Sequence, residues 1–303
     1  MTSFLLLVVC AVLGMITARK VKGAASFTLP MNWWVLNIAL PALVLELLPK
    51  LEFDWHPWFL LVSQWVIFAG AWIGFAALGR ALSWSKGRVG ALVLTAGLGN
   101  TLFIGYPVIE AILGREALPY AVIADQGGAF LSFIVGGAIV AAMYSERDGT
   151  KQVALPRFIV QRLIRFPAMY AIVLGIIVGA IGGWPKDIDA MLLRLGATLT
   201  PIALFSAGLQ FRFRVSSDQR GPLALGLAWK LVLGPAIVYA IGAAAGIGSP
   251  MLAVGVIQAA MAPMVSAAIL ADQNQLEPPL ANSMLALGIL LSVATLAATA
   301  VIF

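Results

Sequence analysis

The sequence predicts an all-α integral membrane protein with ten transmembrane helices, built as a 5+5 inverted repeat in which helices 4 and 9 are broken. Three observations support this fold class. Of 303 residues, 61% are hydrophobic and only 11% are charged, whereas a soluble domain is about 45–50% apolar and about 25% charged. Ten apolar runs follow one another, and two of them, in different halves of the chain, share a proline-centred motif.

The ten runs are each close to the roughly 20 apolar residues that cross a bilayer as helix. We predict spans near residues 3–18, 26–48, 57–79, 88–112, 117–143, 164–184, 188–210, 222–245, 250–272 and 279–303. The first run has little charge before it and three basic residues, Arg19, Lys20 and Lys22, after it. A secretory signal has the opposite polarity. The first run is therefore expected to be a retained helix.

Basic residues alternate between the connecting segments. Clusters of Lys and Arg occupy the first, third, fifth and seventh connections, whereas the second, fourth and sixth hold only Lys50, Arg115 and Lys186. Since Lys and Arg accumulate on the cytoplasmic side, both termini are expected outside and residues 144–163 form a cytoplasmic connecting loop. The same distribution accounts for the net charge of +6 without a nucleic-acid partner.

The fifth connection divides the chain into a first five-helix repeat, residues 1–143, and a second, residues 164–303. An odd number of helices in each repeat makes the second one enter the membrane from the opposite side. Residues 37–45 (Asn-Ile-Ala-Leu-Pro-Ala-Leu-Val-Leu) are echoed by residues 197–205 (Ala-Thr-Leu-Thr-Pro-Ile-Ala-Leu-Phe). Their prolines, Pro41 and Pro201, are predicted to break or bend their helices. Inverted repeats are common in secondary transporters.

Spans 4 and 9 carry the strongest local signals. Residues 97–107 (Gly-Leu-Gly-Asn-Thr-Leu-Phe-Ile-Gly-Tyr-Pro) combine three glycines with a proline, and span 9 contains Gln258 and Pro263. Interrupted backbone at membrane depth is tolerated where it is buried in protein or lines a cavity, and half-helix N-termini suit a carboxylate. We therefore predict a substrate site, with a helix break at Pro107. The alternative is a glycine-rich helix packed on a neighbour through Asn100. The predicted substrate-binding residues of these two spans are Asn100, Thr101, Gly105, Gln258 and Pro263.

Two charged residues lie well inside predicted spans, where charges are costly and usually functional. Lys230 is expected to attract the anion, with snorkelling to the surface as the alternative. Asp125 is a candidate for binding a coupling ion, H⁺ or Na⁺, and the alternative is a structural pair with Lys230. Three further charged residues, Glu46, Glu110 and Arg194, lie near span ends and are expected at the interface.

The sequence lacks the residues that a zinc site or an intramembrane enzyme would need. The single cysteine, Cys10, and single histidine, His56, exclude a zinc site built from these residue types. An intramembrane enzyme would need paired acids or a nucleophile with a base, and no close pair of acids occurs within the spans. We expect no enzyme activity, no metal and no cofactor apart from a coupling ion.

At these residues the sequence resembles the auxin efflux carrier family, within the bile/arsenite/riboflavin transporter superfamily. The segment 100–107, followed by Gly114, is similar to the family's Asn-Thr-Leu-x-x-Gly-x-Pro crossover. Residues 228–235 resemble a family stretch with a basic residue five before proline, and residues 201–209 resemble the seventh helix. Gln258-Ala-Ala-Met begins what looks like the ninth.

The resemblance implies a sodium/proton-antiporter-like fold with crossed helices 4 and 9. Helices 1, 2, 6 and 7 would form a scaffold, often a homodimer contact, and helices 3–5 and 8–10 a moving transport unit. Asn100 would correspond to the substrate-contacting asparagine. Two positions depart from the family pattern, because Ala262 precedes Pro263 and Phe166 precedes Pro167, and the long central loop of plant members is absent. These departures favour a compact carrier of a bacterial inner membrane.

The predicted function is therefore secondary transport of a small organic anion, an auxin-like or malonate-like carboxylate, by elevator-type alternating access. Its expected partners are this anion, membrane lipid and a second copy of the chain. The alternative is a cation-coupled symporter or a cation/proton antiporter on a related fold. An antiporter would show adjacent acids in one helix, and Asp125-Gln126 supplies only one.

Overall fold

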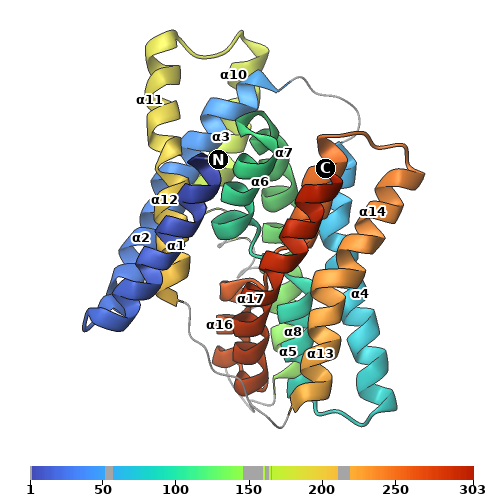
Figure 1. Cartoon of the computed structure of the whole chain (residues 1–303). Coiled ribbons are helices and arrows are strands. Elements are labelled where there is room, and N and C mark those ends of the chain that lie inside the picture. Colours follow the sequence, from blue (N-terminus) through green and yellow to red (C-terminus); the bar gives the residue numbers. More distant parts are fainter. Residues whose placement is uncertain (1, 52–56, 146–159, 161–163, 165, 211–218) are drawn as a thin grey trace. The chain divides into compact units, whose positions relative to one another are not determined.

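The structure, a computed structural model, describes residues 2–51, 57–145, 160, 164, 166–210 and 219–303, and Figure 1 shows its helices. The described residues form helices and no strand, apart from a single antiparallel bridge between Gly99 and Pro263. The prediction of an all-α protein is confirmed.

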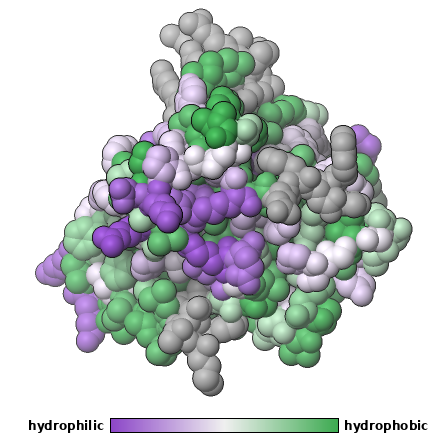
Figure 2. All heavy atoms as spheres, turned by 90° about the horizontal axis from the view of Figure 1, so that it is seen from above, coloured by the Kyte–Doolittle hydropathy of each residue, from purple (hydrophilic) through white to green (hydrophobic). Residues whose placement is uncertain are grey.

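Six helices among the described residues are long and apolar enough to cross a membrane. They are Ala24–Lys50, Pro57–Ala81, Arg115–Tyr144, Lys186–Gln210, Arg220–Ala244 and Pro278–Ile302. Each matches a predicted span with closely similar ends. Large apolar side chains such as Leu29, Ile73 and Val293 are exposed on them, and exposed apolar surface of this extent suits lipid rather than water. Figure 2, a view from above, shows a group of hydrophilic residues on the face it presents, with hydrophobic residues around it.

The other four predicted spans have different forms. The N-terminal span is helix α1 (Thr2–Lys20), and residues 164–184 contain the shorter helix α10 (Pro167–Ala180). Spans 4 and 9 are both interrupted, as described below. The count of ten crossings and the inverted repeat stay predictions, and most of the connection 144–163 lies outside the described residues.

Two compact units make up the fold. The first contains Met1–Trp55, Leu102–Val122 and Gln161–Phe211, and the second contains His56–Thr101, Ile123–Val160 and Arg212–Phe303. Each unit gathers segments that are far apart in the sequence, so each can bring together residues from both halves of the chain.

In the first unit, α1 packs closely on α12, where Gly14 and Gly208 face each other's backbones. Ser206 Oγ donates a hydrogen bond to Asn32 Oδ1 (2.6 Å), and Trp34 Nε1 donates to Thr198 Oγ1 (2.9 Å). The remaining elements are η1 (Ala24–Phe27), α2 (Thr28–Trp34), η2 (Val35–Ala39), α3 (Leu40–Leu47), η3 (Leu48–Lys50), α6 (Tyr106–Leu113), η5 (Arg115–Ala117), α7 (Leu118–Ile123), α11 (Lys186–Ala197) and α12 (Leu199–Gln210).

In the second unit, helix α5 (Lys86–Gly97) lies at the centre and contacts α4, α8, α13, α16 and α17. Its residues from Val89 to Gly97 are all buried, in a core that includes Phe68, Leu94 and Met284. The other elements are α4 (Pro57–Ala81), η6 (Ala124–Phe130), η7 (Ser132–Gly137), α8 (Ala138–Tyr144), α13 (Arg220–Ala228), η9 (Trp229–Leu233), α14 (Gly234–Ala244), α15 (Met251–Ala259), α16 (Val265–Gln273) and α17 (Pro278–Ile302). The segment η4 (Thr101–Gly105) begins in this unit with Thr101, and its other residues belong to the first unit. Because α5 is buried, its C-terminal end at Gly97 lies inside the second unit.

Wide π-type turns accompany three prolines. The π-helical segments η2, η4 and η9 are each followed directly by a helix with proline at its second position: Pro41, Pro107 and Pro235. Proline lacks an N–H and clashes with the carbonyl four residues earlier, and a wide turn relieves that clash. Pro41 and Pro107 thus lie in first helical turns, and Pro201 lies near the start of α12. Wide turns are frequent at functional sites.

Candidate functional site

Two predicted spans are interrupted within the second unit, and the part of the first of them that follows Thr101 belongs to the first unit. Helix α5 starts at an N-cap, Ser85, whose Oγ accepts from Arg88 N (3.1 Å). It ends at Gly97, and Leu98 is extended before the helix resumes at Thr101. Helix α15 ends at Ala259, and α16 begins only after the extended residue Met264.

The two interruptions pair through their backbones. Asn100 N donates to Ala262 O (2.8 Å), and Met264 N donates to Leu98 O (3.0 Å). Gly99 lies opposite Pro263 between these two bonds, at a position where proline's missing N–H costs no hydrogen bond. Each break therefore satisfies part of the other's exposed backbone, as membrane-buried chain requires.

The resumed helices present their N-terminal ends at these breaks. In α16 the first backbone bonds run from Ala267 N and Ala268 N to Met264 O (3.1 and 3.2 Å). The N–H groups of the residues that precede Ala267 in α16 have no carbonyl partner within the helix, because no helical turn comes before them. A helix N-terminus also favours negative charge. Such ends form anion sites in many proteins.

Lys230 brings a positive charge to the same place. It lies in η9, its side chain is fully buried, and Nζ has no hydrogen-bond partner among the described residues. A Cβ added to Gly99 would lie only 2.8 Å from that Nζ, so the ammonium group rests against the backbone of the first break. Lys230 does not snorkel to the surface, and it makes no direct hydrogen bond to Asp125.

Gln258 adds an uncharged polar group. It is fully buried at the end of α15, and both its Oε1 and its Nε2 lack hydrogen-bond partners among the described residues. Its backbone carbonyl lies 3.4 Å from the same added Cβ at Gly99. Buried polar groups are almost always hydrogen-bonded, so an unpartnered amide and an unpartnered ammonium on residues that both adjoin Gly99 indicate a place for a polar ligand.

Asp125 approaches the break from η6. Thr101 Oγ1 donates a hydrogen bond to Asp125 Oδ1, and Gln126 Nε2 donates to Oδ2 at 2.6 Å. All three side chains are buried. Since Thr101 is the first residue of the resumed helix, the carboxylate contacts the break directly.

The predicted site residues thus have different placements. Asn100, Thr101, Gln258, Pro263 and Lys230 lie at or beside the paired breaks of the second unit, with Asp125 next to Thr101. Gly105 lies further along and has helical dihedral angles (φ −62°, ψ −48°) where η4 passes into α6.

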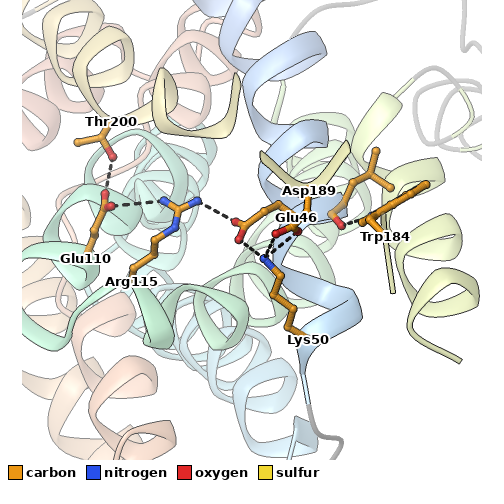
Figure 3. Close-up of polar contacts among 8 residues, drawn as sticks. Glu46, Lys50, Glu110, Arg115, Trp184, Asp189 and Thr200 are labelled. Atoms are coloured by element: carbon orange, nitrogen blue, oxygen red, sulfur yellow. Dashed lines mark hydrogen bonds and ion pairs between the residues drawn. The ribbon is translucent and has the colours of Figure 1, made fainter. Parts of the chain in front are cut away.

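A charge network in the first unit was not predicted from the sequence (Figure 3). The buried Glu46 accepts from Arg115 Nη2 and Lys50 Nζ, both at 2.7 Å. Lys50 also pairs with Asp189 (2.8 Å), and Arg115 Nη1 lies 3.6 Å from Glu110 Oε1. The two acids, Glu46 and Glu110, had been expected at the interface because they lie near span ends. Local spacing gives no link between Glu46 and Arg115, which are 69 residues apart, although Glu46 and Lys50 have i,i+4 spacing.

Two further hydrogen bonds lie at the edges of this network, one from helix α12 and one from the connection that precedes α11. Thr200 Oγ1 of α12 donates to Glu110 Oε2 (2.8 Å), and Trp184 Nε1 donates to the carbonyl oxygen of Leu45 (2.8 Å). The network therefore ties η5 and α6 to α3, α11 and α12 within the first unit.

Arg115→Gln should lower the stability of the protein. The change leaves the buried Glu46 carboxylate with Lys50 alone, and an under-compensated buried charge typically costs about 1–3 kcal/mol. Thermal unfolding in detergent should show a lower midpoint than wild type. Arg80→Gln is the matched control, because Arg80 is exposed. An equal midpoint for Arg115→Gln and wild type would contradict the prediction.

The long apolar helices, together with paired helix breaks around a buried cation, are typical of membrane transporters. A family model described as membrane transport protein matches residues 1–299. An uncharacterized transporter of Methanothermobacter thermautotrophicus is 26% identical over 88% of this chain and 86% of its own length. A probable auxin efflux carrier component 5a of rice (Oryza sativa subsp. japonica) is 25% identical over 77% of this chain and 75% of its own length.

The chain therefore belongs to the membrane transport protein family, which is the auxin efflux carrier family. A second archaeal relative, an uncharacterized transporter of Methanocaldococcus jannaschii, is 29% identical over 40% of this chain and 38% of its own length. The protein is an integral membrane transporter, and the family resemblance seen in the sequence is confirmed. Since the family consists of transporters, the expectation that the chain is not an enzyme is also confirmed.

Proposed function

We propose that the protein is a secondary transporter of a small organic anion, an auxin-like or malonate-like carboxylate, which binds at the paired breaks of the second unit. The observation that carries this proposal is the fully buried Lys230 ammonium beside Gly99, with no hydrogen-bond partner among the described residues. A buried charge without a partner is strongly unfavourable. A bound anion would provide that partner.

The surrounding groups suit a carboxylate. Gln258 offers an unpartnered amide, and the N-terminal ends at Thr101 and Val265 offer backbone N–H groups and a favourable dipole. Asn100 lies between the cation and the resumed helix, and its backbone already holds the break through Ala262. We propose that its side chain contacts the anion, as the resemblance to the family's substrate-contacting asparagine implies.

Movement of the site would follow an elevator scheme. Helices 1, 2, 6 and 7 act as the scaffold, which also forms a homodimer in the bacterial inner membrane, with both termini outside. The transport unit, helices 3–5 and 8–10, comprises the second compact unit together with residues 102–122. Carrying those residues past the scaffold would require the Arg115–Glu46 and Thr200–Glu110 contacts to open.

Asp125 is the proposed site of ion coupling. Ionisable residues within spans commonly bind coupling ions or protons, and this carboxylate contacts Thr101 next to the anion site. Occupation of Asp125 by H⁺ or Na⁺ would therefore alter the end of the helix that faces the substrate.

The test is uptake of labelled acids (malonate, malate and indole-3-acetate) into proteoliposomes. We expect uptake of at least one acid, and at least about a tenfold loss in Asn100→Ala, because one charge-assisted hydrogen bond contributes about 1.5–3 kcal/mol. Asn282→Ala is the matched control, since Asn282 is an exposed residue of α17. Uptake of no acid by a folded preparation, or equal uptake by Asn100→Ala and wild type, would overturn the proposal.

A further inference from the structure

The second unit buries two opposite charges. Among its described residues, Asp125 and Lys230 are the charged side chains that are buried. Their charges sum to zero when Asp125 is ionised and Lys230 is protonated. Because charge at membrane depth is costly, a unit that carries an anion through the membrane should return to neutrality once the anion is bound.

The two charges flank the same three residues. Lys230 Nζ rests against Gly99, and Asp125 accepts from Thr101, with Asn100 between them. Lys230 Nζ donates to no described residue, so the charges do not form a direct hydrogen-bonded pair. Lys230 can therefore pair with an anion, while the carboxylate of Asp125, which already accepts from Thr101 and Gln126, can take up a proton.

We infer that each turnover carries one monocarboxylate anion paired with Lys230 and one proton bound to Asp125, so that transport is electroneutral. This inference rests on the proposed function and specifies its substrate charge and its coupling ion. A monoanion adds one negative charge to the neutral site, and protonation of Asp125 removes one. A dianion would leave a buried negative charge even after protonation.

The contacts of Asp125 favour a proton over a sodium ion. Both carboxylate oxygens accept hydrogen bonds, one from the Thr101 hydroxyl and one from the Gln126 amide N–H. Hard metal cations need several oxygen ligands, whereas here the neighbour at Oδ2 presents an N–H. The described residues contain no group of three or more His, Cys, Asp or Glu side chains that could hold a metal ion.

Few other groups could titrate in place of Asp125. The described elements that pack most extensively against η6 are α4, η7 and α15, and η4 meets it through Thr101. The only charged residue in them is Arg80, exposed at the last turn of α4. Lys230, on η9, faces Gly99 and is the other buried titratable side chain of this unit. Proton uptake linked to anion binding therefore belongs to Asp125 if it disappears in Asp125→Asn, and to Lys230 if it stays.

The hydroxyl of Thr101 connects proton and anion. While Asp125 is ionised, this hydroxyl donates its hydrogen to Oδ1. A proton from water on Oδ1 reverses that bond, since the carboxyl group then donates to Thr101 Oγ1. The hydroxyl hydrogen becomes free to turn toward a carboxylate beside Asn100. Proton and anion then each strengthen the binding of the other, as linkage requires.

The experiment measures protons taken up per bound anion. Titration calorimetry of the purified protein in two buffers of different ionisation enthalpy gives that number directly, with lactate and indole-3-acetate as monocarboxylates and malonate as a dicarboxylate. We expect about one proton per bound monocarboxylate in wild type, about none in Asp125→Asn for any binding that remains, and weaker binding of malonate. Asp272→Asn, at an exposed aspartate of α16, should match wild type.

A vesicle assay gives an independent readout. Uptake of the bound monocarboxylate by wild type should be insensitive to an imposed membrane potential and should rise with external acidity, and Asp125→Asn should lose this acid dependence. Anion binding with no proton uptake, or preference for malonate, would overturn this inference while leaving the proposed transport function intact. Binding of no acid at all would instead count against the proposed function. If Asp125→Asn does not fold, the wild-type proton number alone decides.

Discussion

Lys230→Met should abolish anion uptake and, at the same time, stabilise the protein. The ammonium group is fully buried and has no hydrogen-bond partner among the described residues. Loss of a buried charge that binds the substrate charge costs about 2–5 kcal/mol of affinity, which is at least about a 30-fold loss. Replacing a buried charge with an apolar side chain of similar length is often stabilising, by about 1–4 kcal/mol.

Both halves of this expectation can be measured on one preparation. Uptake of labelled acid into proteoliposomes should fall to background, whereas the midpoint of thermal unfolding in detergent should rise. Lys186→Met is the matched control, because Lys186 is exposed at the first turn of α11, and it should change neither quantity much. Normal uptake by Lys230→Met would show that the Lys230 ammonium does not bind the substrate. A strongly destabilised variant would show that Lys230 has a structural role instead.

Gly14→Ala should be among the most damaging single changes in the first unit. A Cβ at position 14 would fall on the carbonyl oxygen of Phe205 and lie 3.0 Å from Gly208 Cα. Both atoms belong to the backbone of α12, so no side chain can move aside. Overpacking of this kind costs about 1–3 kcal/mol, occasionally more. The measurement is the thermal midpoint in detergent, which should fall by roughly 5 °C or more.

Gly74→Ala is the control for this change. An added Cβ at Gly74, in the middle of α4, meets no atom within 4 Å. Alanine is a better helix former than glycine by about 0.5–1 kcal/mol, so this variant should be as stable as wild type or slightly more stable. Similar losses for both variants would mean that close packing of α1 on α12 does not set the stability.

The spans were predictable because their signal is local. Apolar runs near 26–48, 57–79 and 279–303 match helices Ala24–Lys50, Pro57–Ala81 and Pro278–Ile302. The interruption of span 4 was expected from the glycines and proline of residues 97–107. The sequence predicted that the helix breaks at Pro107, whereas the structure has the break at Leu98–Asn100. Proline is tolerated in the first turn of a helix, and Pro107 occupies such a turn in α6.

The partners of the charged residues were not predictable from one sequence. Thr101 meets Asp125 across 24 residues, and Arg115 meets Glu46 across 69. Such contacts depend on how helices from distant segments pack, for which helical periodicity gives no signal. Lys230 was identified from its depth in the span alone, and its approach to Gly99 follows from the wide turn of η9 before Pro235.

The bridge between Gly99 and Pro263 fixes the main-chain geometry of the site (its frame) independently of the side chains that would contact the substrate. Its two hydrogen bonds join main-chain atoms of Leu98, Asn100, Ala262 and Met264, and they form whatever side chains those residues carry. Side chains around the bridge can therefore be exchanged without loss of the frame. Different acids could be accommodated by relatives through changes at positions such as Asn100 and Gln258, while the main-chain geometry stays the same.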